Sequence, residues 1–307
     1  MAATEDLFHP IVELPEPVRA ARYRRLVGLD EIKDRLRREA QLLADPNRLR
    51  NWSREHHGTD LPALTLFADR GPLFVFAGDV GAGKTALAES FGCDLADALD
   101  LPVFLYRLKL AARGSGLVGE MTTLVSDAFT QMLTLGRKAR GSKGPTSVYI
   151  LVIDEADALA QSRAAEQMHH EDRAGVDALL EGVDGLAGEG VPVLVVLCTN
   201  RERALDPAVM RRAAATFQFG RPNDEQRHAV LADALADTGL TTTDIGRLVA
   251  LTGPSASRPG YTYSDLTQRL IPAAVLTAFP TKPLTIDVLI TVAGQLAPTP
   301  QFRETAT

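Results

Sequence analysis

Five runs of apolar residues recur along the chain, separated by segments in which apolar residues follow helical spacing. The runs lie near residues 73–78, 102–107, 147–153, 192–199 and 215–219. They show little alternation of apolar and polar positions, which is typical of strands buried on both faces of a parallel sheet. Because helices must then cover both faces, the pattern predicts an α/β fold with three layers: helices, a parallel sheet and helices.

The same pattern predicts how the chain is divided. Residues 1–21 contain three prolines and no clear period, so we expect an extended N-terminal arm. Alternating strands and helices place the large α/β domain at residues 22–220. Gly220-Arg221-Pro222 interrupts the alternation, and mainly helical segments follow it. We therefore predict that residues 221–307 form a small all-α lid domain, which pivots at the interruption.

A glycine-rich motif follows the first apolar run. The residues Gly78-Asp79-Val80-Gly81-Ala82-Gly83-Lys84-Thr85 match the pattern G-x-x-x-x-G-K-[ST], and Ala86 continues into a helical segment. Glycines let backbone N–H groups converge on phosphate oxygens, where a side chain would collide. In such a loop Lys84 contacts the β- and γ-phosphates and the Thr85 hydroxyl is a magnesium ligand. The motif predicts that the chain binds a nucleoside triphosphate, which we take to be ATP, together with Mg²⁺.

Two acidic residues end the third apolar run. Asp154 and Glu155 directly follow a buried strand, so both carboxylates are expected at the carboxyl edge of the sheet, beside the phosphate-binding loop. We predict that Asp154 holds Mg²⁺ and that Glu155 polarises the attacking water as a base. A kinase with this loop would not need the second acid, so the pair favours ATP hydrolysis. Residues 154–157 spell Asp-Glu-Ala-Asp, but 307 residues with a helical C-terminal third do not accommodate the two domains of a helicase.

Polar and basic residues after the fourth run extend the predicted site. Asn200 ends a strand expected between the phosphate-loop strand and the acidic strand, so its amide can bond the γ-phosphate and the attacking water. Asp206 and Pro207 are typical of a helix start, and that short helix ends in Arg211 and Arg212. Arginines placed away from the chain's own phosphate loop suit a neighbouring subunit's nucleotide, as a catalytic finger in trans. The sequence leaves open which of the two is the finger.

Composition narrows the classes of function. The formal net charge of −6 argues against a nucleic-acid binder with a broad basic face. No apolar run reaches the ~20 residues that span a bilayer, and the N-terminus lacks a signal-peptide core. Cys93 and Cys198 lie in apolar contexts and are predicted to be reduced core residues. We therefore expect a cytoplasmic protein without a membrane partner, for which nucleic acid is not the expected substrate.

These motifs, in this order and followed by a helical third, resemble an AAA+ ATPase over about residues 22–297. Within that class the chain is most similar to the pachytene checkpoint protein 2 / thyroid-receptor-interacting protein 13 family of HORMA-domain remodellers. The segments that carry this second resemblance are Asp154 to Ala160 with Ser162-Arg163, the pair Arg212-Ala213, and the C-terminal segments 284–286 and 301–304.

The resemblance implies further roles. Val27 and Gly28 are expected near the adenine, and Leu117, Val118 and Gly119 are expected to form a pore loop that faces a central channel. ATP is expected between adjacent subunits of a ring, with a homohexamer as the predicted assembly. Its hydrolysis would pull a peptide segment and unfold or disassemble a protein partner. The family's partner is a HORMA-domain protein in its closed, ligand-bound state, which is reset to an inactive form.

The sequence departs from the family in three respects. Residues 1–21 are too few for the substrate-recognition domain of eukaryotic members, so the chain resembles compact bacterial members found in anti-phage systems with cyclic-oligonucleotide signalling. Leu117 and Val118 stand where the family usually has an aromatic pair, which offers less contact area to a peptide. Ser264 stands where a second sensor arginine is expected. Arg269 and Arg258 are the candidates to replace it.

Three other functions stay open at this point. The first is a different AAA+ chaperone that resembles rubisco activase. A rubisco gene beside this one would favour that function. The second is a nucleic-acid loader or initiator, whose hydrolysis DNA would stimulate; the segment before the expected pore loop offers Arg107, Lys109 and Arg113. The third is a nucleotide-switch scaffold without hydrolysis. The combination of Glu155, Asn200 and an arginine pair disfavours that last alternative.

Overall fold

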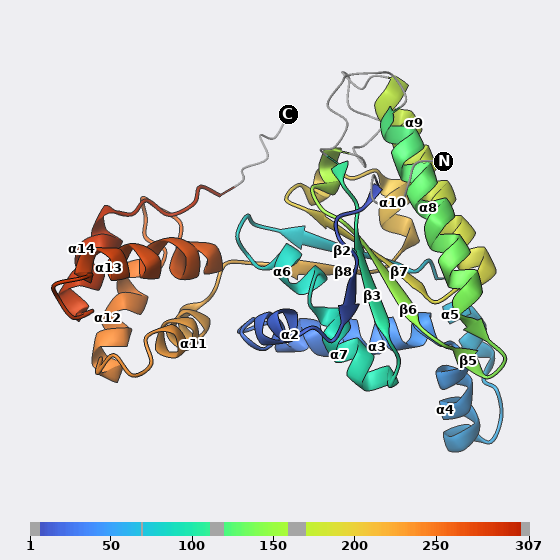
Figure 1. The fold of residues 1–307 in the computed structure, drawn as a ribbon, viewed down its shortest axis with the longest axis horizontal. Coiled ribbons are helices and arrows are strands. Elements are labelled where there is room, and N and C mark those ends of the chain that lie inside the picture. Colours follow the sequence, from blue (N-terminus) through green and yellow to red (C-terminus); the bar gives the residue numbers. More distant parts are fainter. Residues whose placement is uncertain (1–6, 69, 111–119, 159–169, 302–307) are drawn as a thin grey trace. The chain divides into compact units, whose positions relative to one another are not determined.

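The computed structural model describes residues 7–68, 70–110, 120–158 and 170–301, which fall into two compact units. We call them the sheet unit and the lid unit, and Figure 1 shows the elements of both. The sheet unit comprises Met1–Arg25, Glu31–Ala77 and Thr85–Gln218, and the lid unit comprises Leu26–Asp30, Gly78–Lys84 and Phe219–Thr307.

A six-stranded sheet organises the sheet unit, in the order β1-β3-β6-β7-β2-β8. Its strands are β1 (Val12–Leu14), β2 (Leu73–Gly78), β3 (Val103–Arg107), β6 (Val148–Ile153), β7 (Val193–Thr199) and β8 (Ala213–Phe219). All five predicted strands are confirmed. The pairs β3–β6, β6–β7 and β7–β2 are parallel, whereas β1 pairs with β3 in antiparallel register. The sheet is therefore mixed, with an antiparallel edge on an otherwise α/β arrangement.

Helices cover both faces of this sheet. The sheet unit contains α2 (Pro17–Arg24), α3 (Asp30–Ala44), α4 (Asn47–His57), α5 (Thr65–Ala68), α6 (Lys84–Ala88), α7 (Phe91–Leu99), α8 (Glu120–Ala139), α9 (His170–Glu189) and α10 (Pro207–Arg212). Short 3₁₀ turns are η1 (Pro62–Leu64), η3 (Ala156–Ala158) and η4 (Glu202–Ala204), and a small hairpin joins β4 (Arg140–Gly141) to β5 (Gly144–Pro145).

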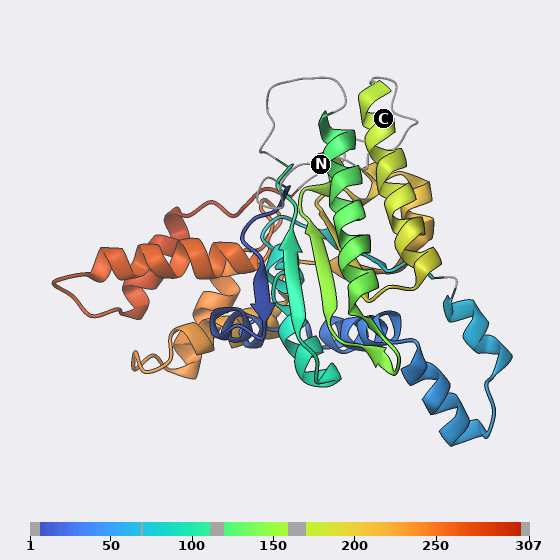
Figure 2. The ribbon, with the colours of Figure 1, turned by 45° about the vertical axis from the view of Figure 1, so that its right-hand side comes forward.

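Helices α8 and α9 lie side by side along one face (Figures 1 and 2). They share a core with alternate residues of the strands, among them Val75, Leu151 and Val195. The strand residues between these face the opposite side, where α7 packs against β1 and β3. There, a Cβ on Gly92 would lie only 2.6 Å from Leu14 and 2.8 Å from Ile150, so the helix approaches the strands closely. The predicted three layers are confirmed.

The N-terminal segment differs from the extended arm that we expected for residues 1–21. Leu7 and Phe8 are buried at 2% exposure, β1 joins the sheet edge, and α2 crosses the expected boundary at residue 21. Pro17 occupies the first helical turn and Glu16 caps it, accepting bonds from two backbone N–H groups. The prolines therefore mark a strand end and a helix start, and the apolar residues between them supply an edge strand.

An ion cluster ties α2 to the segment that follows the phosphate-binding loop. The buried carboxylate of Glu89 accepts bonds from Arg19 at 2.8 Å, Arg22 at 3.2 Å and Arg107 at 3.0 Å. Burial by itself would raise the pKa of Glu89, but the hydrogen bonds and charges of the arginines outweigh burial and lower it. Glu89 is thus held ionised, and the N-terminal helix belongs structurally to the sheet unit.

The lid unit is helical, as predicted. Its elements are α11 (Asp224–Ala234), α12 (Thr242–Thr252), a π-helical segment η5 (Asp265–Leu270), α13 (Ile271–Ala278) and α14 (Ile286–Gln295). They enclose a separate core that includes Leu231, Leu248, Tyr261 and Leu289. The Tyr261 hydroxyl donates to the carbonyls of Ala293 and Leu296, which joins the first part of the unit to its last helix.

The division between units differs in detail from the predicted boundary at 220. The main break falls between Gln218 and Phe219, and two earlier segments, Leu26–Asp30 and Gly78–Lys84, belong with the lid. Hydrogen bonds to residues far along the chain explain why these two segments belong with the lid. The Gly28 carbonyl accepts from Gln226 Nε2 at 3.0 Å, and the Gly81 carbonyl accepts from the Ser264 N–H at 3.1 Å. A local sequence pattern cannot predict hydrogen bonds between residues so far apart in the chain.

Candidate functional site

The phosphate-binding loop begins where β2 ends and finishes where α6 starts. Gly78 and Gly81 both have positive φ, at 145° and 70°. A Cβ on Gly78 would lie 2.0 Å from the Phe219 carbonyl oxygen, and one on Gly81 would lie 2.8 Å from atoms of Thr262 and Ser264. A side chain fits at neither position, so the lid unit's own packing requires these glycines.

Lys84 closes the loop on itself. Its buried amine donates to the carbonyl of Gly78 at 3.0 Å and to that of Asp79 at 2.7 Å. Ala82 is buried, whereas Val80 is exposed. The amine is thus fixed against the first two residues of the loop, where a positive charge can attract phosphate oxygens.

The predicted magnesium ligands lie together in the sheet unit. The Thr85 hydroxyl donates to Asp154 Oδ2 at 2.8 Å, and Asp154 Oδ1 accepts from the Glu155 N–H at 3.0 Å. Thr85 is the second residue of α6 and Asp154 follows β6, so two segments distant in sequence bring hydroxyl and carboxylate oxygens to one point. Oxygen donors of this kind suit a hard cation such as Mg²⁺.

Glu155 is exposed and has φ of +52°, in the left-handed region that non-glycine residues seldom adopt. Its N–H bonds the Asp154 carboxylate, and this bond holds the unusual turn. The backbone therefore directs two successive carboxylates differently: Asp154 is half-buried on Thr85, while Glu155 is open to solvent. Strained backbone at such a position supports a functional role.

Asn200 follows β7, which lies between β6 and β2 as predicted. The buried residue before it, Thr199, donates its hydroxyl to Asp157 Oδ1 at 3.0 Å and accepts from the Arg201 N–H at 2.9 Å. The Thr199 hydroxyl thus links the residue before Asn200 to the backbone N–H of the residue after it. In the sequence, Asp157 stands out only as the last residue of Asp-Glu-Ala-Asp; its bond to Thr199, next to Asn200, appears only in the tertiary structure.

The arginine pair ends α10. Asp206 caps this helix, accepting from the Ala208 N–H at 2.7 Å, and Pro207 is its first residue, both as predicted. Arg211 is exposed, whereas Arg212 is half-buried and bonded to Asp184 of α9. Those bonds raise the pKa of Arg212, which is charged in any case. The two arginines therefore differ in environment, a difference that the sequence did not reveal.

The candidate second sensors are bonded inside the lid unit. Arg269 pairs with the buried carboxylate of Asp265 at 2.6 Å. Arg258 donates to the Leu251 carbonyl and stacks over the Tyr261 ring, 5.8 Å from its centroid. Each arginine thus has a structural task in the lid core, and neither contacts the phosphate-binding loop through these bonds.

The predicted adenine segment also has a defined place. Gly28 has φ of +73°, and a Cβ there would lie 2.3 Å from the Gln226 amide. Val27 is partly buried against the lid core. The expected pore loop Leu117-Val118-Gly119, the pair Ser162-Arg163 and the C-terminal residues from Phe302 onward lie outside the described residues.

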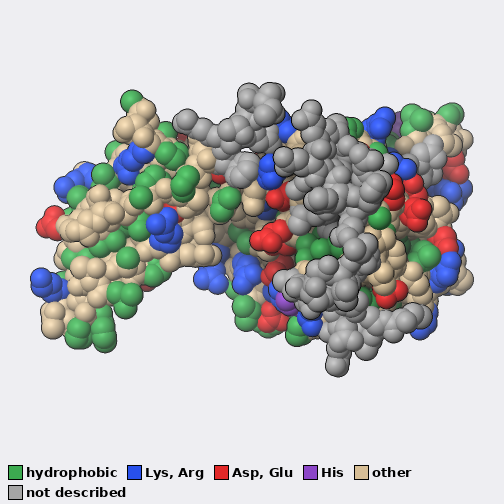
Figure 3. All heavy atoms as spheres, turned by 90° about the horizontal axis from the view of Figure 1, so that it is seen from above, with side chains coloured by type: hydrophobic (Ala, Val, Ile, Leu, Met, Phe, Trp, Pro, Cys, Tyr) green, Lys and Arg blue, Asp and Glu red, His purple; other side chains and the backbone are tan. Residues whose placement is uncertain are grey.

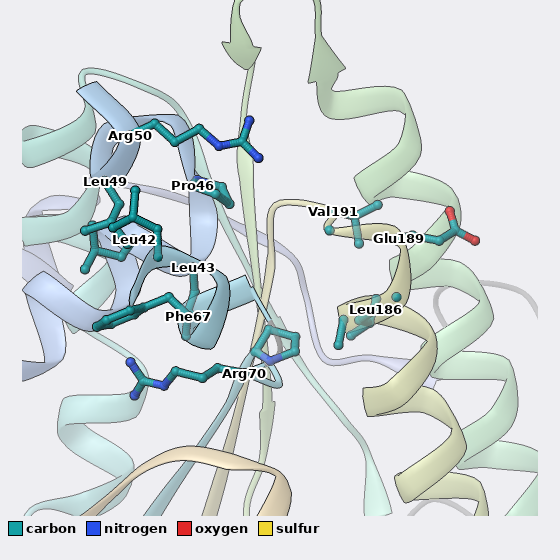
Figure 4. Close-up of a pocket in the computed structure, with 15 residues that line it drawn as sticks. Leu42, Leu43, Pro46, Leu49, Arg50, Phe67, Arg70, Leu186, Glu189 and Val191 are labelled. Atoms are coloured by element: carbon teal, nitrogen blue, oxygen red, sulfur yellow. The ribbon is translucent and has the colours of Figure 1, made fainter. Parts of the chain in front are cut away.

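A cavity of about 330 Å³ lies elsewhere in the sheet unit, between α3, α4, α5 and the end of α9 (Figure 4). Apolar side chains such as Leu42, Leu43 and Phe67 line it, together with Arg70 and Glu189. Pro72, at the start of β2, also lines it, so it opens at the amino end of that strand, opposite to the end that carries the loop. None of the predicted nucleotide-binding residues is among those that line it.

Figure 3 shows all heavy atoms from above, turned by 90° about the horizontal axis from the view of Figure 1, with side chains coloured by type. On the described part of this face, acidic and basic side chains are interspersed. Among the described residues, no helix has both the length and the apolar character to cross a bilayer. Cys93 and Cys198 are both buried and unbridged, as predicted.

Comparison with known sequences agrees with this architecture. The model of the ATPase family associated with various cellular activities (AAA) matches residues 74–221. The chain is 47% identical over 300 residues to CD-NTase-associated protein 6 of Escherichia coli (strain MS 115-1), covering 97% of this chain and 96% of that protein. A protein of the same name from Escherichia coli (strain KTE188) is 36% identical over 296 residues, with 96% and 97% covered.

Solved structures give the same assignment. The chain matches one in the HORMA:CdnC:Trip13 complex of E. coli MS115-1 with a TM-score of 0.92 and 46% identity, covering 98% of this chain and 99% of that one. Rhizobiales Trip13 matches with a TM-score of 0.75 and 38% identity over 95% and 99% of the two chains. Because relatives of this similarity cover nearly the whole of both units, the chain belongs to the AAA family of ATPases, within the group of CD-NTase-associated protein 6 and Trip13.

Proposed function

We propose that the chain is a Mg²⁺-dependent ATPase that remodels a HORMA-domain protein. Proteins of the AAA family are ATPases, so membership of this family supports ATP binding and hydrolysis in general. The substrate class is inferred from the relative that shares 46% identity and is solved with HORMA and CdnC proteins. That likeness, at a TM-score of 0.92, is the observation on which the proposal chiefly rests.

In the proposed reaction, the backbone of the phosphate-binding loop and Lys84 hold the triphosphate. Thr85 and Asp154 provide oxygen ligands for Mg²⁺, and their 2.8 Å contact supports this assignment. When bound there, the cation would offset negative charge on the phosphates. Glu155 accepts a proton from the attacking water, and Asn200 orients that water and the γ-phosphate.

We propose that the chemistry is completed between subunits of a homohexamer. Arg212, or its neighbour Arg211, would approach the γ-phosphate held by the next subunit and stabilise the charge that develops there. Arginine fingers of this kind contribute about 10³ to 10⁵ in rate. Hydrolysis would move the lid unit about its main boundary, between Gln218 and Phe219, and not about residues 220–222, because Arg221 is bonded within the lid. The pore loop Leu117-Val118-Gly119 would move along a central channel and so pull a segment of the partner.

The proposed partner is a HORMA-domain protein in its closed, ligand-bound state, converted to an inactive form within an anti-phage system that signals through cyclic oligonucleotides. A cytoplasmic location follows as part of the same proposal. The names of the relatives support this setting, because they associate those proteins with a CD-NTase.

Substrate capture tests the proposal. Glu155→Gln should bind ATP without hydrolysing it and hold the partner on the ring, so that a HORMA-domain protein co-purifies in the presence of ATP. Lys84→Ala serves as the control, because it should lose nucleotide binding and capture nothing. If Glu155→Gln instead captured rubisco, or if DNA stimulated the wild-type ATPase several-fold, one of the two rival functions would replace this one.

A further inference from the structure

Every polar atom of Asp79, the second residue of the phosphate-binding loop, is bonded. Its N–H donates to the Phe219 carbonyl at 3.0 Å, and its own carbonyl accepts from Lys84 Nζ at 2.7 Å. Its Oδ1 accepts from the Val80 N–H at 3.0 Å, and its Oδ2 accepts from Arg221 Nε at 2.5 Å. Because Asp79 anchors the lysine amine and is itself held on all sides, whatever fixes Asp79 also fixes Lys84.

Arg221 is the side chain that fixes it. This arginine is only 10% exposed, and its three nitrogens bond in three directions within the lid unit. Besides Nε on Asp79, its two terminal nitrogens donate to the carbonyl of Gly260 at 2.5 Å and to the carbonyl of Thr299 at 2.8 Å. A guanidinium is rigid and planar, so these bonds lock the loop to two distant stretches of the lid.

The lid end of this linkage is also rigid. The Thr299 N–H and hydroxyl both donate to Asp265, at 2.9 and 2.7 Å, and Asp265 is fully buried. Asp265 accepts in addition from the Thr262 N–H at 3.0 Å. A continuous set of bonds therefore runs from Lys84 through Asp79, Arg221 and Thr299 to Asp265.

The charges add a second consequence. The Asp79 carboxylate is 15% exposed and belongs to a loop that must hold a polyanion. An unpaired carboxylate there would repel phosphate, and the repulsion would be strong because water screens a half-buried site poorly. Arg221 cancels this charge at a distance of 2.5 Å. It thus favours nucleotide binding electrostatically and positions Lys84 geometrically.

We propose that Arg221 is a positioning residue of the nucleotide site, which couples the phosphate-binding loop to the lid in place of the second sensor arginine that Ser264 replaces. The inference rests on the proposed nucleotide site and not on the proposed substrate. Its test therefore uses nucleotide binding and ATPase assays alone, and failure of substrate capture would leave it intact.

A set of four variants separates the electrostatic effect of Arg221 on nucleotide binding from its geometric effect on the position of Lys84. The charge of the Asp79–Arg221 pair is zero in the wild type, −1 in Arg221→Ala, +1 in Asp79→Asn and zero in the double variant. Fluorescent ADP should therefore bind about tenfold more weakly to Arg221→Ala and about tenfold more tightly to Asp79→Asn, with the double variant in between. The fourth variant, Arg221→Lys, keeps the charge but cannot make three directed bonds.

Arg221→Lys should therefore bind ADP within about threefold of wild type, while kcat falls by roughly tenfold or more because Lys84 is less well positioned. Arg247→Ala is the matched control, since Arg247 is an exposed lid arginine paired with Asp244 on its own helix. It should change neither affinity nor kcat.

Two results would overturn the proposal. Equal ADP affinity in Arg221→Ala, Asp79→Asn and wild type would show that the pair's charge is not felt at the site. Wild-type kcat in Arg221→Lys would show that the three directed bonds are not needed. Arg221→Lys and Asp79→Asn retain a side chain of similar size, so both remain measurable if Arg221→Ala fails to fold.

Discussion

Arg212 of α10 and Asp184 of α9 form a two-pronged ion pair, in which Nε and a terminal nitrogen of the arginine each lie 2.7 Å from a carboxylate oxygen. Both side chains are substantially exposed, at 35% and 53%. A pair this exposed contributes about 1 kcal/mol or less. Arg212 is thus held by a pair that is weak enough to be exchanged for a phosphate oxygen, as the proposed contact with a neighbouring subunit requires.

Asp184→Asn should therefore raise ATP turnover of the assembled ring modestly, by up to about fivefold, because 1 kcal/mol corresponds to that factor. Steady-state ATPase rates at saturating ATP and high protein concentration would measure it. Arg212→Ala should instead lower turnover by 10³-fold or more while nucleotide binding persists. If Asp184→Asn lost activity as severely as Arg212→Ala, the result would show that Asp184 orients Arg212 for catalysis and does not merely hold it while it is inactive.

Arg211 offers the matched comparison for the choice of finger. It precedes Arg212 on the same short helix and is exposed. We expect Arg211→Ala to retain most of the wild-type turnover, and a loss as large as that of Arg212→Ala would reverse the assignment.

A mixing experiment tests the shared site. Arg212→Ala subunits lack the proposed finger and Glu155→Gln subunits lack the proposed base, so each variant alone should be inactive. In mixed rings, a junction that combines an intact Glu155 with a neighbour's intact Arg212 should hydrolyse ATP. The measured rate should peak near equal proportions of the two proteins. Mixtures that stayed as inactive as their components at every ratio would rule out catalysis in trans.

Thr199→Val tests how the Asn200 turn is held. Valine has nearly the same shape, but it removes the hydroxyl that donates to Asp157 and accepts from the Arg201 N–H. The lost bonds should cost about 1–3 kcal/mol in the free energy of unfolding, and ATP turnover should fall about 10- to 100-fold as Asn200 shifts. Denaturant unfolding and ATPase rates give the two values. Thr134→Val, at an exposed helical threonine, is the control and should alter neither.

Asp265 predicts how the lid responds to acid. Burial by itself raises the pKa of Asp265, but hydrogen bonds from Thr262, Thr299 and Arg269 outweigh it, and the pKa is lowered. A carboxyl whose pKa is lower in the folded state contributes stability above its unfolded pKa of about 4 and loses it as the pH falls through the folded value. The melting temperature of wild type should therefore exceed that of Asp265→Asn at pH 7. The difference should shrink below about pH 4, and a constant difference down to pH 2 would contradict this account.

Much of the fold could be predicted from local patterns. The five apolar runs became strands at their predicted places because strands buried on both faces must be continuously apolar, and helix signals such as Asp206-Pro207 act within a few residues. The N-terminal segment was interpreted wrongly, because its apolar residues are few and an edge strand of three residues has no recognisable period.

The features of the candidate site also fall into those that the local sequence predicts and those that only the tertiary structure reveals. The sequence by itself determined the phosphate-binding loop, Asp154, Glu155 and the helix that carries the arginines, since each of these depends on residues adjacent in the chain. Only the tertiary structure decided that Arg221 bonds Asp79, that Asp184 holds Arg212 and that Asp157 holds the Asn200 turn. These partners lie 142, 28 and 42 residues apart, and a side-chain pairing over such separations depends on how the whole chain packs.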